Sequence, residues 1–394
     1  MIVVVGIGAG GWDEIPVRHQ QLIRDSAVLL GGKRHLDLVP DVPGQRREPW
    51  PSPLREGLPA LIDGLGDAVA LASGDPLVSG IGTTLISLLG RENVRIEPAV
   101  SSVALARARM RWPAESCAVV SLVGRDVSLV ARELAPGRRI LALSSDESTP
   151  GQVANLLVTA GLGASSLTVL GELGTETESM QTATASAWAR EVPRLNIVAI
   201  ECVGAPLFGW AAGLPDDAFE NDGQLTKRDL RASALARLAP VPGQHLWDVG
   251  AGAGSVGIEW MRAHPTCTTT AIEANPDRAA RIARNASHLG VPGLTVVEGR
   301  APDALADLPA PDAIFIGGGA TRPGVLDACL RALRPGGRIV VHGVTLETEQ
   351  LLATAYQAHG GELTRIAVET SAPIGTFTGW APARSVTQWT HSIG

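Results

Sequence analysis

The sequence contains little that would place it among secreted, metal-binding or membrane-spanning proteins. Its cysteines, Cys117, Cys202, Cys267 and Cys329, show no CxxC or CxxH spacing, so we expect free thiols and neither a disulfide framework nor a bound metal. No apolar run approaches the length of a membrane span. The first residues, MIVVVGIGAGG, lack a basic segment, which favours a strand over a signal peptide. We therefore expect a cytoplasmic protein.

Positive charge is scarce as well. The chain has 33 Lys and Arg against 40 Asp and Glu, a formal net charge of −7. No basic excess is available to neutralise phosphates, which argues against a nucleic-acid partner. Only Lys33 and Lys227 are lysines, and the arginines that supply the rest can bind carboxylates in a planar, bidentate way.

The length of 394 residues predicts two or three domains. Apolar runs typical of strands alternate with helix-compatible segments, which predicts α/β architecture. The alternation lapses over residues 206–222, a stretch rich in Gly, Pro and acids that we interpret as a linker. The candidate strands lie at 2–8, 68–73, 119–124, 139–144, 167–172 and 196–201 before it and at 245–252, 267–274, 294–299, 312–319 and 337–344 after it.

A glycine-rich turn opens the second half, in LWDVGAGAGSVGIEW (246–260). A short apolar strand leads into Gly250, Gly252 and Gly254, and Ser255 begins a helix whose free N–H groups favour an anionic ligand. The next predicted strand ends in Glu273, 23 residues after Gly250, where a carboxylate can accept hydrogen bonds from ribose hydroxyls.

Two ligands fit this outline. The dinucleotide fingerprint GxGxxG/A requires Gly or Ala where Ser255 stands. The GxGxG spacing instead resembles motif I of class I S-adenosylmethionine (SAM) methyltransferases, which have a Rossmann-like fold. The segments 297–302, 311–319 and 333–341 resemble the later motifs of the same class.

The resemblance narrows to the precorrin methyltransferase and decarboxylase family through GQLTKRDLRASAL (223–235), PDAIFIGGG (311–319) and VTLET (344–348). It predicts a class I domain over 223–394. Arg300 stands where relatives often carry Asp. The SAM-binding residues that the resemblance implies are Thr226, Asp248, Gly250, Ala251, Gly252, Ala253, Gly254, Glu273, Arg300 and Ala301.

Three motifs in the first half, GIGAG (6–10), SGDP (73–76) and PAVSS (98–102), resemble the tetrapyrrole methylase family, a class III fold. The resemblance implies a domain over 1–205 with two lobes, about 1–112 and 113–205. Ala9 and Ala99 replace a family proline and glycine. The SAM-binding residues implied here are Gly8, Gly74, Asp75, Ser101 and Ser102.

The order of the two domains resembles the decarboxylating precorrin C(5,15)-methyltransferase family of cobalamin biosynthesis. That implies methylation of a reduced tetrapyrrole at carbons 5 and 15, loss of CO₂ from an acetate side chain, two SAM per chain and a homo-oligomer. His342 and Arg322 are the catalytic candidates. The alternatives are a SAM methyltransferase with another substrate, such as RNA, and one degenerate domain, or an NAD-dependent oxidoreductase with a regulatory domain.

Overall fold

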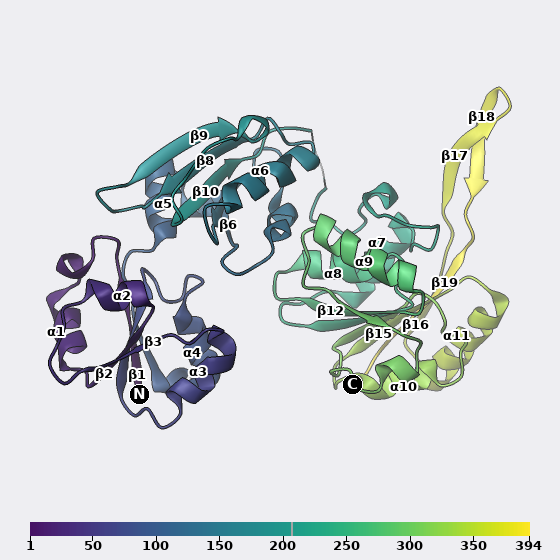
Figure 1. Ribbon diagram of the computed structural model, residues 1–394. Helices are drawn as coiled ribbons and strands as arrows, with labels where there is room; N and C mark the ends of the chain where they lie inside the picture. The colour runs from purple at the N-terminus through teal and green to yellow at the C-terminus, as the bar shows by residue number, and fades with distance from the viewer. Residues whose placement is uncertain (206–207) are drawn as a thin grey trace. The chain divides into compact units, whose positions relative to one another are not determined.

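The computed structural model describes residues 1–205 and 208–394. The chain divides into two compact units (Figure 1). The first comprises Met1–Val127 and Ala135–Pro206, and the second comprises Ser128–Leu134 and Leu207–Gly394. The predicted α/β architecture is confirmed.

The first sheet of unit 1 is entirely parallel, in the order β3-β2-β4-β1-β5. The central strand β1 is buried on both faces: Val3 and Val5 enter one core cluster, and Ile2 and Val4 enter another. This explains the unbroken apolar run at the start of the sequence. The strands are β1 (Ile2–Ile7), β2 (Val28–Gly31), β3 (Arg46–Pro49), β4 (Ala68–Ser73) and β5 (Val94–Glu97), and the helices are α1 (Val17–Asp25), α2 (Lys33–Leu38), α3 (Leu54–Ile62), α4 (Ile81–Leu89) and α5 (Ser102–Met110).

The second sheet of unit 1 is mixed, in the order β6-β7-β10-β8-β9. Only β6 and β7 pair in parallel, and the other pairs are antiparallel. Helix α5 packs onto this sheet through Val103 and Ala106, which share a core cluster with Leu141 and Leu170. The elements are β6 (Cys117–Ser121), β7 (Arg139–Leu143), α6 (Thr149–Thr159), β8 (Ser166–Gly171), β9 (Ser179–Thr184) and β10 (Asn196–Glu201).

Unit 2 is built on a seven-stranded sheet in the order β13-β12-β11-β14-β15-β19-β16. The first five strands are parallel, and β19 is antiparallel to both of its neighbours. The elements are α7 (Arg228–Leu238), β11 (His245–Val249), α8 (Ser255–Ala263), β12 (Thr268–Glu273), α9 (Pro276–His288), β13 (Thr295–Glu298), β14 (Ala313–Ile316), α10 (Val325–Ala332), β15 (Arg338–Gly343), α11 (Leu346–His359), β16 (Glu362–Ile366) and β19 (Val386–Ser392).

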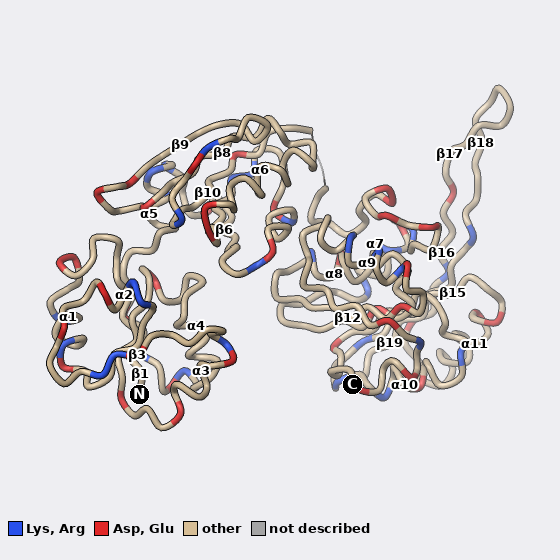
Figure 2. The backbone as a smooth tube through the Cα atoms, in the orientation of Figure 1, with Lys and Arg blue, Asp and Glu red and all other residues tan. Residues whose placement is uncertain are grey.

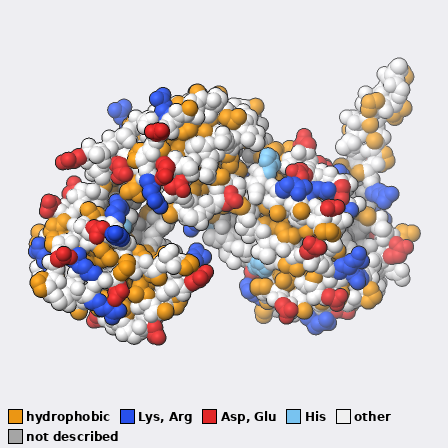
Figure 3. Space-filling view, viewed as in Figure 1, with side chains coloured by type: hydrophobic (Ala, Val, Ile, Leu, Met, Phe, Trp, Pro, Cys, Tyr) orange, Lys and Arg blue, Asp and Glu red, His pale blue; other side chains and the backbone are white. Residues whose placement is uncertain are grey.

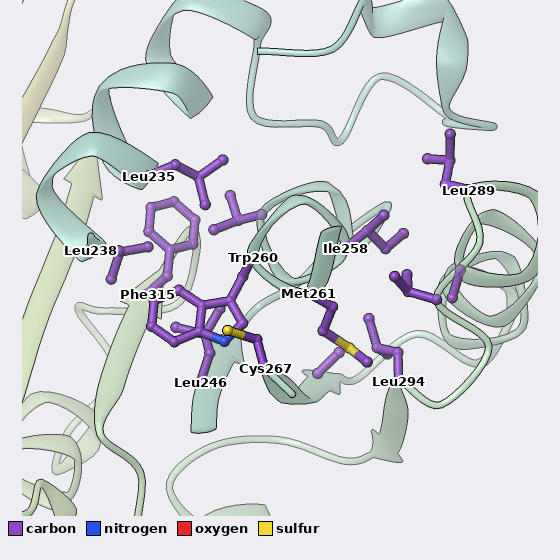
Figure 4. Packing of buried hydrophobic residues seen from close by; sticks show 14 of the residues in the cluster. Leu235, Leu238, Leu246, Ile258, Trp260, Met261, Cys267, Leu289, Leu294 and Phe315 are labelled. Carbon is purple, nitrogen blue, oxygen red and sulfur yellow. The ribbon is translucent and has the colours of Figure 1, made fainter. Parts of the chain in front are cut away.

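Each face of this sheet has its own core. On one face Trp260 and Phe315 pack with Leu235 and Leu238 of α7 (Figure 4). On the other, Trp247 and Trp389 pack with side chains of α10 and α11. A hairpin, β17 (Glu369–Ile374) and β18 (Phe377–Pro382), leaves the sheet between β16 and β19 and projects from it (Figure 1).

The predicted linker, residues 206–222, contains more structure than a connector needs. Within its described part, Asp216–Ala218 form a 3₁₀ turn. Leu214, Ala218 and Phe219 are buried in the core of unit 2. The domain limits drawn from the sequence stay a prediction.

Candidate functional site

The carboxyl edge of the unit 2 sheet contains a cavity of about 870 Å³. Its walls come from loops after five neighbouring parallel strands, from the segment before α7 and from the base of the β17–β18 hairpin. Ligand sites of open α/β sheets characteristically form at this edge. The lining residues used below are Gln224, Thr226, Lys227, Gly250, Ala251, Gly252, Glu273, Arg300, Ala301, Gly318, Arg322, His342, Thr370 and Arg384.

The glycine turn after β11 has a backbone that side chains would obstruct. Gly250, Gly252 and Gly254 all have positive φ, at 69°, 60° and 76°. A Cβ on Gly250 would lie 2.7 Å from the carbonyl oxygen of Gly318, and one on Gly252 would lie 2.6 Å from that of Gln224. Glycine therefore allows the turn and two other cavity loops to meet.

Glu273 joins the turn to the end of β12. Its Oε2 accepts a hydrogen bond of 2.8 Å from the Gly252 N–H, and Oε1 accepts one of 2.9 Å from the Asn275 N–H. The side chain is almost fully buried yet lines the cavity. Each carboxylate oxygen retains a second lone pair that a ligand hydroxyl could use.

Asp248 lies elsewhere than the sequence motif suggests. It does not line the cavity: Oδ2 accepts a hydrogen bond of 2.9 Å from the Gly257 N–H in α8, and the residue is 1% exposed. Burial raises the pKa of this carboxyl to about 7, partly opposed by the Gly257 bond and assisted by the negative charge of Glu273. Its place in this structure is beneath the turn, where it fixes the start of α8.

The last two residues of the turn also face inward. Ala253 is fully buried, and its carbonyl oxygen accepts a hydrogen bond from Asn285 Nδ2 at 3.0 Å. A Cβ on Gly254 would lie 2.7 Å from Ile282. Both residues shape the turn from behind and are absent from the cavity lining.

The segment before α7 is anchored by a buried guanidinium. Arg231 is fully buried and donates from Nε to Glu259 Oε1 at 2.5 Å. Its Nη1 donates to the carbonyl oxygen of Thr226 at 2.5 Å, and Nη2 donates to that of Leu214. The cavity position of Thr226 is thus set from the core of the unit.

Three arginines at the cavity, Arg300, Arg322 and Arg384, are exposed. None forms an ion pair or hydrogen bond through its side chain with any residue that the structure describes. They differ from Arg278, which Asp222 engages at 2.8 Å. Three guanidinium groups can therefore meet anionic groups of a ligand.

His342 lies deeper, at the end of β15, and is 8% exposed. Its Nε2 is 2.9 Å from Gln388 Oε1, and its ring packs edge-on against Phe315. Burial lowers the pKa of the imidazole, and the bond to Gln388 acts weakly in the opposite direction.

Sequence reasoning missed the contribution of the hairpin. Val368, Thr370, Ala383 and Arg384 at its base line the cavity. They lie more than 100 residues from the glycine turn, in a segment without an apolar period. Only the return of the chain through the antiparallel strand β19 places them there.

In unit 1 the three predicted loops meet at the carboxyl edge of the first sheet. The Gly74 N–H donates to the Ile7 carbonyl at 2.8 Å, and the Ala99 N–H donates to the Gly74 carbonyl at 3.0 Å. Ser101 caps α5 by accepting from the Ala104 N–H, and Asp75 accepts from the Leu77 N–H. Gly8 lies on the loop after β1, and Ser102 is the first residue of α5.

A polar cluster that the sequence did not single out lies beside these loops. His35 Nε2 is 3.0 Å from Ser73 Oγ, and Arg34 Nη2 is 3.3 Å from the same oxygen. Burial, and then the charge of Arg34, lowers the pKa of His35 to about 4. This imidazole is therefore neutral near pH 7.

Neither a metal-binding cluster nor a membrane-spanning helix occurs in the described residues, 1–205 and 208–394. No group of three or more His, Cys, Asp or Glu side chains in that part of the chain is arranged to hold a metal ion. No helix within it is long and apolar enough to cross a bilayer.

Known proteins resemble both units. A family model described as tetrapyrrole (corrin/porphyrin) methylases matches residues 1–188, and one described as a precorrin methyltransferase domain matches residues 217–392. A precorrin-6Y C(5,15)-methyltransferase [decarboxylating] of Sinorhizobium sp. is 45% identical over 398 residues, which cover 100% of this chain and 96% of that protein. The chain belongs to the precorrin-6Y C(5,15)-methyltransferase (decarboxylating) family.

Two proteins of Salmonella typhimurium each match part of this family member. A cobalt-precorrin-7 C(5)-methyltransferase is 34% identical over 177 residues, 44% of this chain and 84% of that protein. A cobalt-precorrin-6B C(15)-methyltransferase (decarboxylating) is 36% identical over 138 residues, 35% of this chain and 70% of that protein. The two activities in the family name thus also occur on separate chains.

Proposed function

We propose that the chain methylates a reduced precorrin at carbons 5 and 15, with SAM as methyl donor, and removes CO₂ from an acetate side chain. The observation that carries this proposal is the full-length match at 45% identity to a bifunctional relative. The cavity of unit 2 supports it, because a glycine turn, a buried carboxylate and unpaired arginines line one space. SAM supplies an electrophilic methyl group on a sulfonium.

The residues of unit 2 fit this donor. Gly250 and Gly252 leave backbone exposed at the cavity, and Glu273 offers acceptors to ribose hydroxyls. Arg300, Arg322 and Arg384 are suited to a polycarboxylate ring, because a guanidinium binds a carboxylate through two parallel bonds. The protein would then act mainly by fixing the reacting carbon in line with the methyl group and by excluding water.

We further propose one SAM site in each unit, with C5 methylation in unit 1 and C15 methylation and decarboxylation in unit 2. The two single-activity relatives support this division. Mass spectrometry of products from full-length variants tests it. Asp75→Ala should give a product with one methyl group that has lost CO₂, whereas Gly252→Ala should leave the acetate intact.

Calorimetric titration provides the matching count of SAM sites. The wild-type chain should bind two SAM, and each variant should bind one. A single site in the wild type would support the degenerate-domain alternative, and binding of NAD in place of SAM would support the oxidoreductase. Loss of CO₂ with the Gly252→Ala chain at the wild-type rate would refute the assignment of unit 2.

The remaining expectations about partners are also proposals. We propose self-association through the β17–β18 hairpin, where Ile374, Phe377 and Trp380 are 62%, 80% and 71% exposed; Figure 3 shows hydrophobic side chains along it. We propose no nucleic-acid partner, since Lys and Arg alternate with Asp and Glu along both units (Figure 2). Light scattering and a binding assay with RNA test the two statements.

A further inference from the structure

The two reactions proposed for unit 2 have opposite proton demands. When a ring carbon that bears hydrogen is methylated, a C–C bond forms and the C–S electron pair leaves with sulfur. The C–H electron pair then returns to the ring as a proton departs. When the acetate loses CO₂, the electron pair of the broken C–C bond stays on the side-chain carbon, which takes up one proton to become a methyl group. One proton is released and one is consumed.

We propose that His342 accepts the first proton through Nδ1 and supplies the second, and that Gln388 positions the ring for this transfer. The inference rests on the proposed function of unit 2. The transfer needs no further reagent, because methylation releases one proton and decarboxylation consumes one.

The geometry leaves one ring nitrogen for the cavity. His342 and Gln388 are directly paired across β15 and β19, so their side chains share a face of the sheet. Gln388 Oε1 lies 2.9 Å from His342 Nε2, and it also accepts from Ser233 Oγ of α7 at 3.3 Å. An amide oxygen that receives two donors fixes the Nε2–H tautomer. The lone pair then belongs to Nδ1, and no described residue forms a hydrogen bond with that atom.

Gln388 is held in this orientation at a cost. The residue is 1% exposed, and its Nε2 has no hydrogen-bond partner in the described part of the chain. An unpaired buried amide N–H₂ destabilises a fold, because it has lost its hydrogen bonds to water and gained none in return. The amide oxygen of Gln388 faces His342 while the amide nitrogen is left unpaired. We therefore treat Gln388 as a positioning residue.

The other ionisable groups at the cavity suit the role less well. Arginines do not release protons in proteins. Both oxygens of Glu273 accept backbone bonds, and Asp216 pairs with Arg231 and Lys227. The side chains packed on His342, from Phe315 and Gln388, carry no titratable proton. The charged cavity groups that can influence its titration are Asp216, Lys227, Arg228, Asp229, Glu273, Arg278, Arg300, Arg322 and Arg384.

The experiment uses the full-length chain, SAM and the reduced precorrin, with CO₂ release and product mass as readouts. His342→Ala should slow CO₂ release by about 100-fold or more, the range for loss of a general acid or base. Both SAM affinities and the single methylation assigned to unit 1 should stay within two-fold of wild type. Added imidazole should restore CO₂ release, a rescue that a structural role of His342 would not produce.

Gln388→Glu gives an independent test if His342→Ala does not fold. A carboxylate facing Nε2 favours the imidazolium, so the pH at which CO₂ release falls on the acidic side should move upward. Gln388→Leu should lower the rate without changing SAM affinity. CO₂ release at wild-type rate by His342→Ala, failure of imidazole to rescue it, or an unmoved pH profile in Gln388→Glu would overturn the proposal. A wild-type chain that releases no CO₂ would instead refute the proposed function.

Discussion

The carboxylate of Glu273 accepts a 2.8 Å hydrogen bond from the backbone N–H of Gly252. This bond joins the end of β12 to the glycine turn after β11, so one side chain both shapes the turn and lines the cavity. A ligand that contacts either residue depends on both.

Glu273→Ala should weaken SAM binding to unit 2 by about 1–3 kcal/mol, because the Gly252 and Asn275 N–H groups and the ligand lose a buried acceptor. Glu298→Ala is the matched control, since Glu298 is the register partner of Glu273 on β13, is exposed and does not line the cavity. Isothermal calorimetry measures both. Equal affinities of the two variants would remove Glu273 from the site.

Gly252→Ala should abolish SAM binding to unit 2, because the new Cβ would meet the Gln224 carbonyl oxygen at 2.6 Å. Gly336→Ala separates this contact from backbone strain: Gly336 also has positive φ, at 75°, but nothing lies within 4 Å. The control should lose only about 1–2 kcal/mol of stability and retain its SAM stoichiometry. If both variants lose the site, strain alone explains the effect.

Asp248→Asn should change how stability depends on pH. Folding raises the pKa of Asp248 from 3.8 to about 7, so the folded state binds this proton more tightly than the unfolded state. The stabilisation that comes from binding this proton is fully present below pH 4 and is lost as the pH rises through 7. The free energy of unfolding falls by about 4 kcal/mol at most over this range. The melting temperature of the wild type, compared with that of Asp248→Asn, should therefore fall between pH 4 and pH 7. A constant difference over this range would contradict the buried carboxyl.

Arg231→Met should lower the stability of unit 2 by about 3–5 kcal/mol, because Glu259 keeps a buried charge without its cation. Arg237→Met is the control: Arg237 pairs with Glu362 at the surface, where the side chains are 34% and 53% exposed, and such pairs contribute about 0–1 kcal/mol. Scanning calorimetry compares the transitions. Adding Glu259→Gln to Arg231→Met should recover part of the loss.

The sequence predicted strands best where a local apolar run corresponds to a strand that is buried in the structure. The apolar runs that contain Val249, Ile272 and Ile316 were predicted to be strands, and the structure confirms them as β11, β12 and β14. Buried parallel strands give nearly continuous apolar stretches, which is why these runs could be recognised. The edge strands β3 and β9 and the hairpin were not predicted from the sequence, because their exposed positions leave no apolar period. The strand β19 was missed because four buried residues, Val386–Trp389, include two polar ones.

The site residues also divide into those that a local motif predicts and those that depend on tertiary packing. Gly250, Gly252 and Glu273 follow from a motif whose backbone requirements are local. The motif could not show that Asp248 turns into α8, since burial of a carboxylate depends on what packs over it. Gln388 reaches the site through antiparallel pairing of β19 with β15, and Arg384 lies just before β19. No spacing in the sequence encodes that register.

The anchoring of Thr226 by Arg231 has a consequence for motion. The guanidinium that holds this carbonyl also bonds the Leu214 carbonyl and Glu259 in the core. Opening the segment before α7 would therefore break the same buried bonds that global unfolding breaks. The amide of Arg231, which donates to the Lys227 carbonyl oxygen at 2.7 Å, should therefore exchange with deuterium at a rate close to that of the central strands.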